Sequence, residues 1–136
     1  MAAPEIDSKL DVALGLSLES AEDGVATLLL EPGEPAVVED QGLTYLHGGA
    51  LATCIDTAAW YAADSAAPGG EEDYWVISGL SFEALRLAGD EPHTVVARCV
   101  RAGRTRAVVD VEIAPRERPE RLVTVGRVSL SRAPRN

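Results

Sequence analysis

A His-Gly-Gly motif, His47–Gly49, constrains this chain more than any other segment. It opens a long alanine-rich run in which the only acidic residue before Asp64 is Asp56. Paired glycines inside a helix cost roughly 1 kcal/mol each relative to alanine, but at a helix start they leave the backbone N–H groups uncovered. N–H groups at the positive end of a helix dipole bind oxyanions. The motif therefore predicts a helix whose start can hold a negatively charged oxygen.

The run from Ala50 to Ala63 has an almost entirely apolar helical wheel. One face carries Leu51, Cys54, Ile55, Ala58, Tyr61 and Ala62, whereas Thr53, Asp56, Thr57 and Trp60 lie on the other. Asp56 lies one turn before Trp60, and we expect it in a crevice beside that tryptophan. Burial there would raise the pKa of Asp56 and make it a better base. In the alternative reading, Asp56 faces solvent or caps a loop and His47 only caps the helix.

This segment resembles the hotdog-fold acyl-CoA thioesterases, specifically the phenylacetate-pathway type, and the resemblance extends over roughly residues 15–131. The residues that carry it are Gln41, His47, Gly48, Gly49 and Asp56. The resemblance implies that the Gly48 N–H polarises the thioester carbonyl and that Asp56 acts as nucleophile or general base. It also implies that Gln41 places water or substrate and that His47 orients the loop and the substrate. Gly49 would contact the substrate as well.

Aromatic residues near this segment suit an aromatic or medium-chain acyl group. The pocket is expected to be lined by Trp60, Tyr61, Tyr45 and Trp75. Trp75 also stands where many relatives have a serine or threonine on the strand after the helix, and Ser78 is nearby.

The expected reaction is hydrolysis of an acyl-CoA thioester to a carboxylic acid and coenzyme A. No cofactor is expected beyond the coenzyme A of the substrate, and no metal, because the two histidines, His47 and His93, are far apart in the sequence. Two other functions stay open: a non-catalytic module that binds acyl-CoA or fatty acid, and a hotdog hydratase or dehydratase.

The net charge of −10 is unevenly divided. Residues 1–85 carry sixteen acidic side chains and one lysine, whereas residues 86–136 carry eleven arginines and six acidic side chains. A negative overall field argues against nucleic acid and against an acidic carrier protein as partners. Coenzyme A phosphates need only a few local arginines. Candidates are Arg86, Arg98, Arg101, Arg104 and Arg106. Alternatively, these arginines pair with acidic residues on the solvent face of strands.

Length and composition predict one domain over residues 1–136. With 46% hydrophobic residues the chain can bury a sizeable core, and no apolar run approaches the roughly 18 residues of a membrane span. Cys54 and Cys99 have no metal-ligand spacing and are expected to be reduced core residues. Because the first residues lack the pattern of an export signal, we expect a cytoplasmic protein.

The order of elements predicts an α+β hotdog fold, in which a curved antiparallel sheet of five to six strands wraps a long central helix. A short helix is expected over Ser8–Leu14 and a loop over Pro32–Leu46. Strands are expected over Gly15–Ser20, Val25–Glu31, Tyr74–Leu85, Thr94–Arg101, Thr105–Ile113 and Arg121–Ser131. Open sheet edges favour association. The resemblance implies a homodimer whose active sites combine residues of both chains, with dimers often pairing into tetramers.

Overall fold

The computed structural model describes residues 6–135 of the chain. Its helices are α1 (Lys9–Leu14), α2 (Gly48–Ala66) and the short 3-10 helix η1 (Glu34–Ala36). Its strands are β1 (Leu16–Glu22), β2 (Val25–Leu30), β3 (Val37–Asp40), β4 (Leu43–Leu46), β5 (Asp73–Ala84), β6 (His93–Ala102), β7 (Arg106–Pro115) and β8 (Thr124–Pro134).

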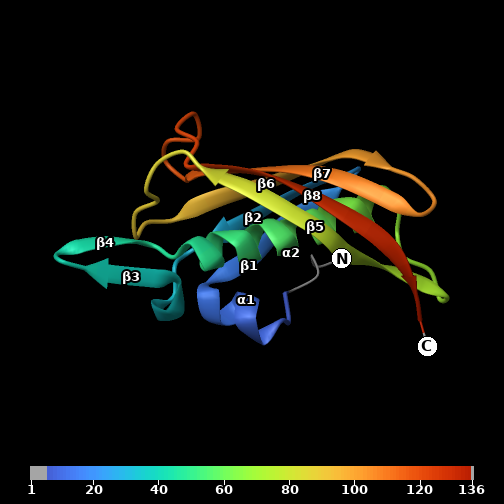
Figure 1. The fold of residues 1–136 in the computed structure, drawn as a ribbon, viewed down its shortest axis with the longest axis horizontal. Coiled ribbons are helices and arrows are strands. Elements are labelled where there is room, and N and C mark those ends of the chain that lie inside the picture. Colours follow the sequence, from blue (N-terminus) through green and yellow to red (C-terminus); the bar gives the residue numbers. More distant parts are fainter. Residues whose placement is uncertain (1–5, 136) are drawn as a thin grey trace.

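Six of the strands form one sheet in the order β1-β2-β6-β7-β8-β5, and every neighbouring pair is antiparallel. Strands β1 and β5 are therefore the two edges of the sheet within the described residues. Strands β3 and β4 pair only with each other. Their hairpin extends beyond the N-terminal end of α2 (Figure 1).

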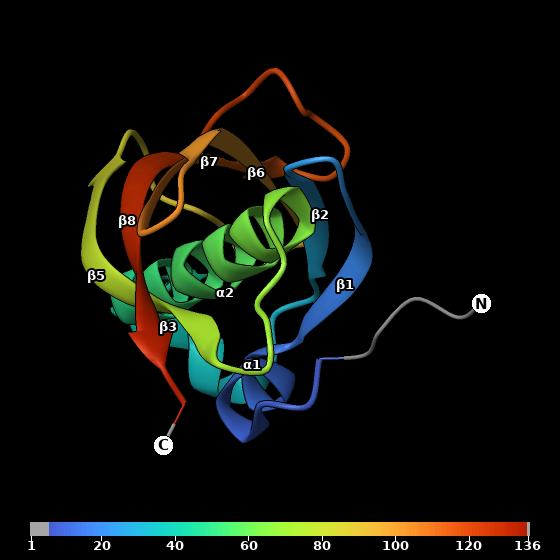
Figure 2. The same ribbon diagram turned by 90° about the vertical axis from the view of Figure 1, so that its right-hand side faces the viewer.

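Helix α2 lies in the concave face of the sheet, which curves around it from β1 to β5 (Figure 2). The helix approaches the sheet closely because the buried side of α2 is rich in alanine, including Ala58, Ala59 and Ala62, each fully buried. Gly126 in β8 completes this close fit, since a Cβ there would lie 3.1 Å from Ile55 Cδ1. The predicted hotdog architecture is confirmed, with six strands in the main sheet.

Most predicted elements are confirmed to within a few residues, but the prediction of a loop over Pro32–Leu46 is wrong. That segment contains η1 and the β3–β4 hairpin. Its turn is made by Gln41 and Gly42, whose φ angles are 51° and 81°. Two consecutive positive φ angles give the turn geometry that two-residue hairpins favour. Backbone hydrogen bonds from Leu46 N to Ala88 O and from His47 N to Ala36 O hold the base of the hairpin, each at 2.8 Å.

The two cysteines are free: Cys54 is buried and Cys99 is half-buried against the core. Within residues 6–135, no helix has the length and apolar character needed to cross a membrane.

Candidate functional site

The start of α2 presents a free backbone donor. His47 is the N-cap of the helix, and its Nδ1 accepts a 2.8 Å hydrogen bond from the N–H of Gly49. The N–H of Gly48 has no acceptor within residues 6–135, and Gly48 is exposed. No acidic side chain in the first turn neutralises the positive helix end. The capping role that the alternative reading gave His47 is therefore present, and it leaves Gly48 as the available donor.

Asp56 lies in the wall of a cavity of about 280 Å³. The cavity is lined by Ile6, Asp7, Ser8, Asp11, Asp56, Thr57, Trp60 and Tyr61. Asp56 is half-buried, and within the described residues its carboxylate has no hydrogen-bond partner. Desolvation raises the pKa of Asp56, and the negative charge of Asp11 raises it further. The expected crevice beside Trp60 and the direction of the pKa shift are both confirmed.

Asp11 and Thr57 belong to this cavity, although neither of them was assigned a role from the sequence. The Thr57 hydroxyl donates a 2.8 Å hydrogen bond to Asp11 Oδ1, and Asp11 is only 5% exposed. Ser8 is the N-cap of α1, and its hydroxyl oxygen accepts from the Asp11 N–H at 3.4 Å. Only the packing of α1 against α2, which sequence periodicity does not reveal, brings Asp11 beside Asp56.

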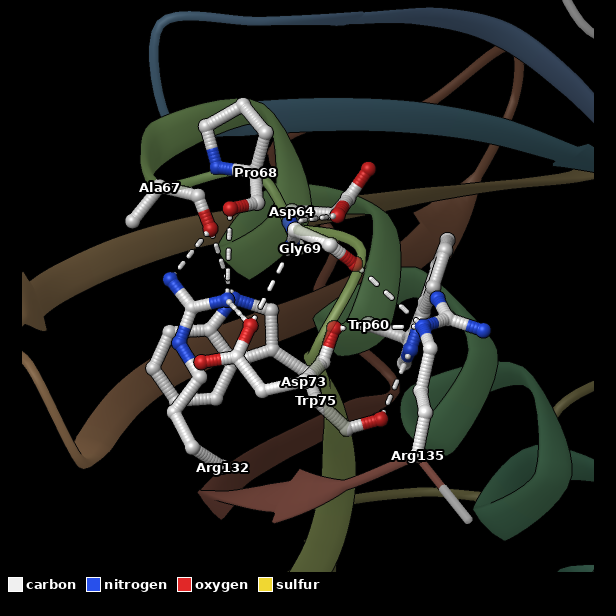
Figure 3. Close-up of polar contacts among 10 residues, drawn as sticks. Trp60, Asp64, Ala67, Pro68, Gly69, Asp73, Trp75, Arg132 and Arg135 are labelled. Atoms are coloured by element: carbon white, nitrogen blue, oxygen red, sulfur yellow. Dashed lines mark hydrogen bonds and ion pairs between the residues drawn. The ribbon is translucent and has the colours of Figure 1, made fainter.

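The two tryptophans occupy different places. Trp60 lines the Asp56 cavity, whereas Trp75 is 1% exposed and lies under the Arg132 guanidinium, whose carbon is 3.9 Å from the ring centroid. The Trp75 indole donates a 2.8 Å hydrogen bond to Ala67 O at the C-terminal end of α2 (Figure 3). In this chain Trp75 is thus a core residue beneath a cation, and contrary to our expectation it does not line the Asp56 cavity. Ser78 is exposed, and its hydroxyl donates to Ser129 O at 3.2 Å.

Gln41 and Tyr45 lie on the β3–β4 hairpin and outside the Asp56 cavity. Gln41 sits at the exposed hairpin turn with a φ of 51°, a conformation that residues other than glycine, asparagine and aspartate seldom adopt. Such backbone outliers cluster at functional sites. Gln41 therefore lies at an exposed hairpin turn in a backbone conformation that costs free energy.

The candidate coenzyme A arginines lie at both ends of α2. Arg86 is in the β5–β6 loop, which the Leu46–Ala88 hydrogen bond ties to the N-terminal end of the helix. Arg104 is in the β6–β7 turn, near the C-terminal end of the helix. There the N–H of Gly24 donates to Ser65 Oγ in the last turn of α2, and the carbonyl oxygen of Gly24 accepts from the Cys99 N–H in β6. All five candidate arginines are exposed, and within residues 6–135 none forms an ion pair. The alternative that they pair with acidic residues is not observed.

Across residues 6–135, no group of three or more histidine, cysteine, aspartate or glutamate side chains is placed to hold a metal ion. The cavity supplies the carboxylates of Asp7, Asp11 and Asp56 beside aromatic side chains, and the start of α2 supplies a backbone donor.

A long helix wrapped by a curved antiparallel sheet, with a carboxylate on the helix and a free amide at its start, defines a hotdog-fold protein. Comparison with family models identifies the family: the chain belongs to the thioesterase superfamily, whose model matches residues 43–120. The matched segment runs from β4 through α2 to the loop after β7 and so contains Gly48 and Asp56. No curated protein sequence matches the chain significantly.

Solved structures share the fold over nearly the whole chain. A conserved protein of Pseudomonas aeruginosa is 27% identical, with a TM-score of 0.79 over 93% of this chain and 94% of that one. The PaaI protein from the phenylacetic acid degradation operon of E. coli is 24% identical, with a TM-score of 0.78 over 93% and 86%. A variant of a Staphylococcus aureus thioesterase is 21% identical, with a TM-score of 0.82 over 93% and 100%.

Proposed function

We propose that this protein is an acyl-CoA thioesterase. The observation that carries the proposal is Asp56, a half-buried carboxylate without a hydrogen-bond partner in the described residues, on the same helix whose first N–H is free. Membership of the thioesterase superfamily supports the same reaction class.

The reaction adds water to the thioester and releases a carboxylic acid and coenzyme A. In one route Asp56 removes a proton from water as the water oxygen bonds to the carbonyl carbon. In the other, Asp56 attacks that carbon and water opens the resulting anhydride. In both routes the carbonyl oxygen becomes negative, and the Gly48 N–H would stabilise it by about 3 to 4 kcal/mol. The C–S bond then breaks and the thiolate takes up a proton.

A single chain does not bring these two groups to one carbonyl. Eight residues separate Gly48 from Asp56 along α2, which is about 12 Å at 1.5 Å per residue. Oxyanion donors and nucleophiles must each lie about 3 Å from the reacting atoms. We therefore propose that a site takes Gly48 from one copy of the chain and Asp56 from another.

A two-fold dimer would satisfy this requirement. If two α2 helices lie antiparallel and cross near Ala52, the partner copy's Gly48 is level with Asp56. Within residues 6–135 one edge of β5 has no strand partner, and it offers backbone groups through which the two sheets can join. In the same arrangement, Arg86 of one copy and Arg104 of the other lie at the same end of the helix pair. Both arginines then have access to the coenzyme A of one site, and dimers could pair further into tetramers.

Gln41 fits the same assignment. In the Staphylococcus aureus thioesterase, two solved variants replace a glutamine and a glutamate that are fifteen positions apart. Gln41 and Asp56 have the same separation. The strained backbone at Gln41 is a second reason to propose that this side chain places water or substrate.

The aromatic wall of the Asp56 cavity, formed by Trp60 and Tyr61, suits an aromatic or medium-chain acyl group. These substrates are soluble metabolites, and two free cysteines are compatible with a reducing compartment. We propose the cytoplasm as its location.

The test is a panel of acyl-CoA thioesters with detection of the released thiol. Asp56→Asn should keep the fold and lower kcat roughly 100-fold or more, because the amide can serve neither as base nor as nucleophile. Asp64→Asn is the matched control, since this carboxylate lies two turns further along α2 and accepts from Gly69 N at 3.0 Å. Binding without turnover across the panel would favour an acyl-CoA-binding module, and a wild-type rate in Asp56→Asn would remove Asp56 from the mechanism.

A further inference from the structure

Helix α1 buries Leu14, as a surface helix should, but it also buries a charge and exposes two apolar side chains. Asp11 is 5% exposed, whereas its neighbours Leu10 and Val12 are 57% and 58% exposed. A surface helix normally turns its apolar residues inward. A buried carboxylate is costly unless it is hydrogen-bonded or paired. The position of Asp11 therefore needs a specific reason.

Asp11 is fixed against the helix that carries Asp56. Its Oδ1 accepts the 2.8 Å hydrogen bond from Thr57, the residue that follows Asp56 in the chain. Asp11, Asp56 and Thr57 all line the same cavity. The contact thus connects α1 to α2 at the position of the proposed catalytic carboxylate.

Within the described residues, every titratable side chain facing this cavity is acidic or phenolic. They are Asp7 before α1, Asp11 on α1, and Asp56 and Tyr61 on α2. No lysine, arginine or histidine among residues 6–135 lines the cavity. Asp7 is exposed to solvent, so water screens its charge. Asp11 is buried, so water screens its charge less than that of Asp7, and no cation among residues 6–135 lines the cavity to neutralise it.

We propose that Asp11 is a positioning residue that acts through Asp56. Its carboxylate, which Thr57 holds on the wall of the same cavity, makes Asp56 a stronger base in thioester hydrolysis. This inference rests on the proposed function. A nearby like charge disfavours the ionised form of a carboxyl group, so Asp56 holds a proton more firmly. The raised pKa of Asp56 has desolvation as its main cause and the Asp11 charge as its second.

The proton has a defined route in the general-base reaction. It passes from water to Asp56 as the new C–O bond forms, and from Asp56 to the thiolate sulfur as the C–S bond breaks. A base whose pKa is closer to the working pH favours the first transfer, so the charge of Asp11 contributes at that step. Asp11 itself touches neither water nor substrate in this scheme.

Asp11→Asn separates this role from a structural one. Asparagine keeps the volume of the side chain and an oxygen that can accept from Thr57, but it removes the charge. The acid limb of the pH profile of kcat/KM should move to lower pH. We expect kcat on the plateau to fall several-fold, by less than the roughly 100-fold loss in Asp56→Asn. KM and the melting temperature should change little.

Three further variants complete the experiment. Asp11→Glu keeps the charge and should hold the acid limb near its wild-type position. Asp23→Asn removes one negative charge in the β1–β2 turn, where φ is 52° and asparagine is tolerated, and it measures the effect of net charge alone. Asp11→Ser is a second neutral variant for the case in which Asp11→Asn does not fold.

An acid limb that stays at the wild-type pH in the neutral Asp11 variants would overturn the inference, as would an equal displacement in Asp23→Asn. The proposed function is judged separately by Asp56→Asn. If Asp56→Asn loses activity and the acid limb of Asp11→Asn does not move, Asp56 is catalytic and Asp11 is only structural.

Discussion

The indole Nε1 of Trp60 donates a 3.1 Å hydrogen bond to the backbone oxygen of Trp75 (Figure 3). This bond joins α2 to the edge strand β5 and fixes the plane of the Trp60 ring at the wall of the Asp56 cavity. Trp75 is held in turn by its own bond to Ala67 O and by Arg132 above its ring. The wall of the cavity formed by Trp60 is therefore rigid. The size of the Trp60 ring should limit the acyl groups that fit beside Asp56.

Trp60→Ala should enlarge the cavity and shift the preference of the enzyme toward bulkier acyl groups. The expected change in discrimination between large and small acyl chains is about 1 to 3 kcal/mol, measured as a ratio of kcat/KM values over a substrate series. Trp60→Phe is the control, because it removes the hydrogen bond to Trp75 O but keeps an aromatic wall. If the rank order of substrates is the same in Trp60→Ala and wild type, Trp60 does not contact the acyl group.

The features that the sequence predicted are those with a strong local signal. The alanine-rich period of α2, the Gly-Gly at its start and the alternation in the long strands depend on nearby residues only. The β3–β4 hairpin was missed because each strand has only four residues and because prolines and glycines precede it. Four residues give too few alternations to distinguish a strand from a loop.

The site was predicted less completely than the fold, for a related reason. Asp56 stood out as a lone charge on an apolar helix, but Asp11 lies in a segment of ordinary polar composition. Its burial arises from the docking of α1 on α2. The burial of Trp75 likewise depends on Arg132, a residue more than fifty positions away in the chain. Such tertiary contacts leave no local pattern.

Gly48→Pro should remove the oxyanion donor without disturbing the fold. Gly48 is the first residue of α2, where proline is well tolerated because its missing N–H has no partner inside the helix. The preceding His47 has φ of −62° and ψ of 135°, the extended conformation that proline requires before it. We expect kcat to fall about 10²- to 10³-fold with an unchanged melting temperature.

Gly48→Ala is the matched control, because it keeps the N–H and its Cβ would meet no atom of residues 6–135 within 4 Å apart from its chain neighbours and the backbone of its own helix. It should retain most of the activity. Equal losses in the alanine and proline variants would mean that the Gly48 side of the site needs space rather than a donor.

Mixing Gly48→Pro with Asp56→Asn tests whether one site uses two chains. Each variant alone is expected to be nearly inactive. A dimer with one chain of each kind has one site with both groups intact if Gly48 and Asp56 come from different chains. After random subunit exchange at equal amounts, roughly a quarter of the wild-type activity should return. Sites built within one chain would give no recovery, so the thiol-release rate of the mixture distinguishes the two arrangements.

His93 should make the protein less stable as the pH falls. Its side chain is fully buried; its Nδ1 lies 2.6 Å from Glu91 O, and its Nε2 has no partner within the described residues. Burial lowers the pKa of His93 below its ordinary value of 6.5. The unfolded chain therefore binds a proton at a pH where the folded chain does not.

The contribution of neutral His93 to the free energy of unfolding is fully present above about pH 7. It is lost as the pH falls from 6.5 toward the pKa of His93 in the folded chain, by at most about 1.4 kcal/mol per pH unit. Urea unfolding between pH 5 and 8 measures this slope. His93→Asn, which keeps a donor near Glu91 O, should have a smaller slope over the same range whatever its absolute stability. Equal slopes in the two proteins would assign the pH dependence to other groups.

Arg104→Ala should weaken the binding of coenzyme A thioesters without affecting the chemistry. Arg104 is exposed and has no acidic partner among residues 6–135, so its charge is available to a phosphate. An exposed ion pair of up to about 1 kcal/mol corresponds to a rise in KM of roughly 5-fold or less. The values of kcat should stay unchanged, because the contact is remote from the reacting carbonyl.

Two comparisons make the interpretation of Arg104→Ala specific. Truncated thioesters that lack the nucleotide should show neither the rise in KM nor the loss of activity with added salt that screening imposes on the full substrate. Arg127→Ala is the matched control, since Arg127 is also exposed but pairs with Asp110, with 2.6 Å between Nε and Oδ1. Equal effects of Arg104→Ala on full and truncated thioesters would mean that Arg104 supports the β6–β7 turn. A preference for an acyl-carrier protein over acyl-CoA at equal concentration would contradict the argument that the negative charge of the protein disfavours an acidic carrier.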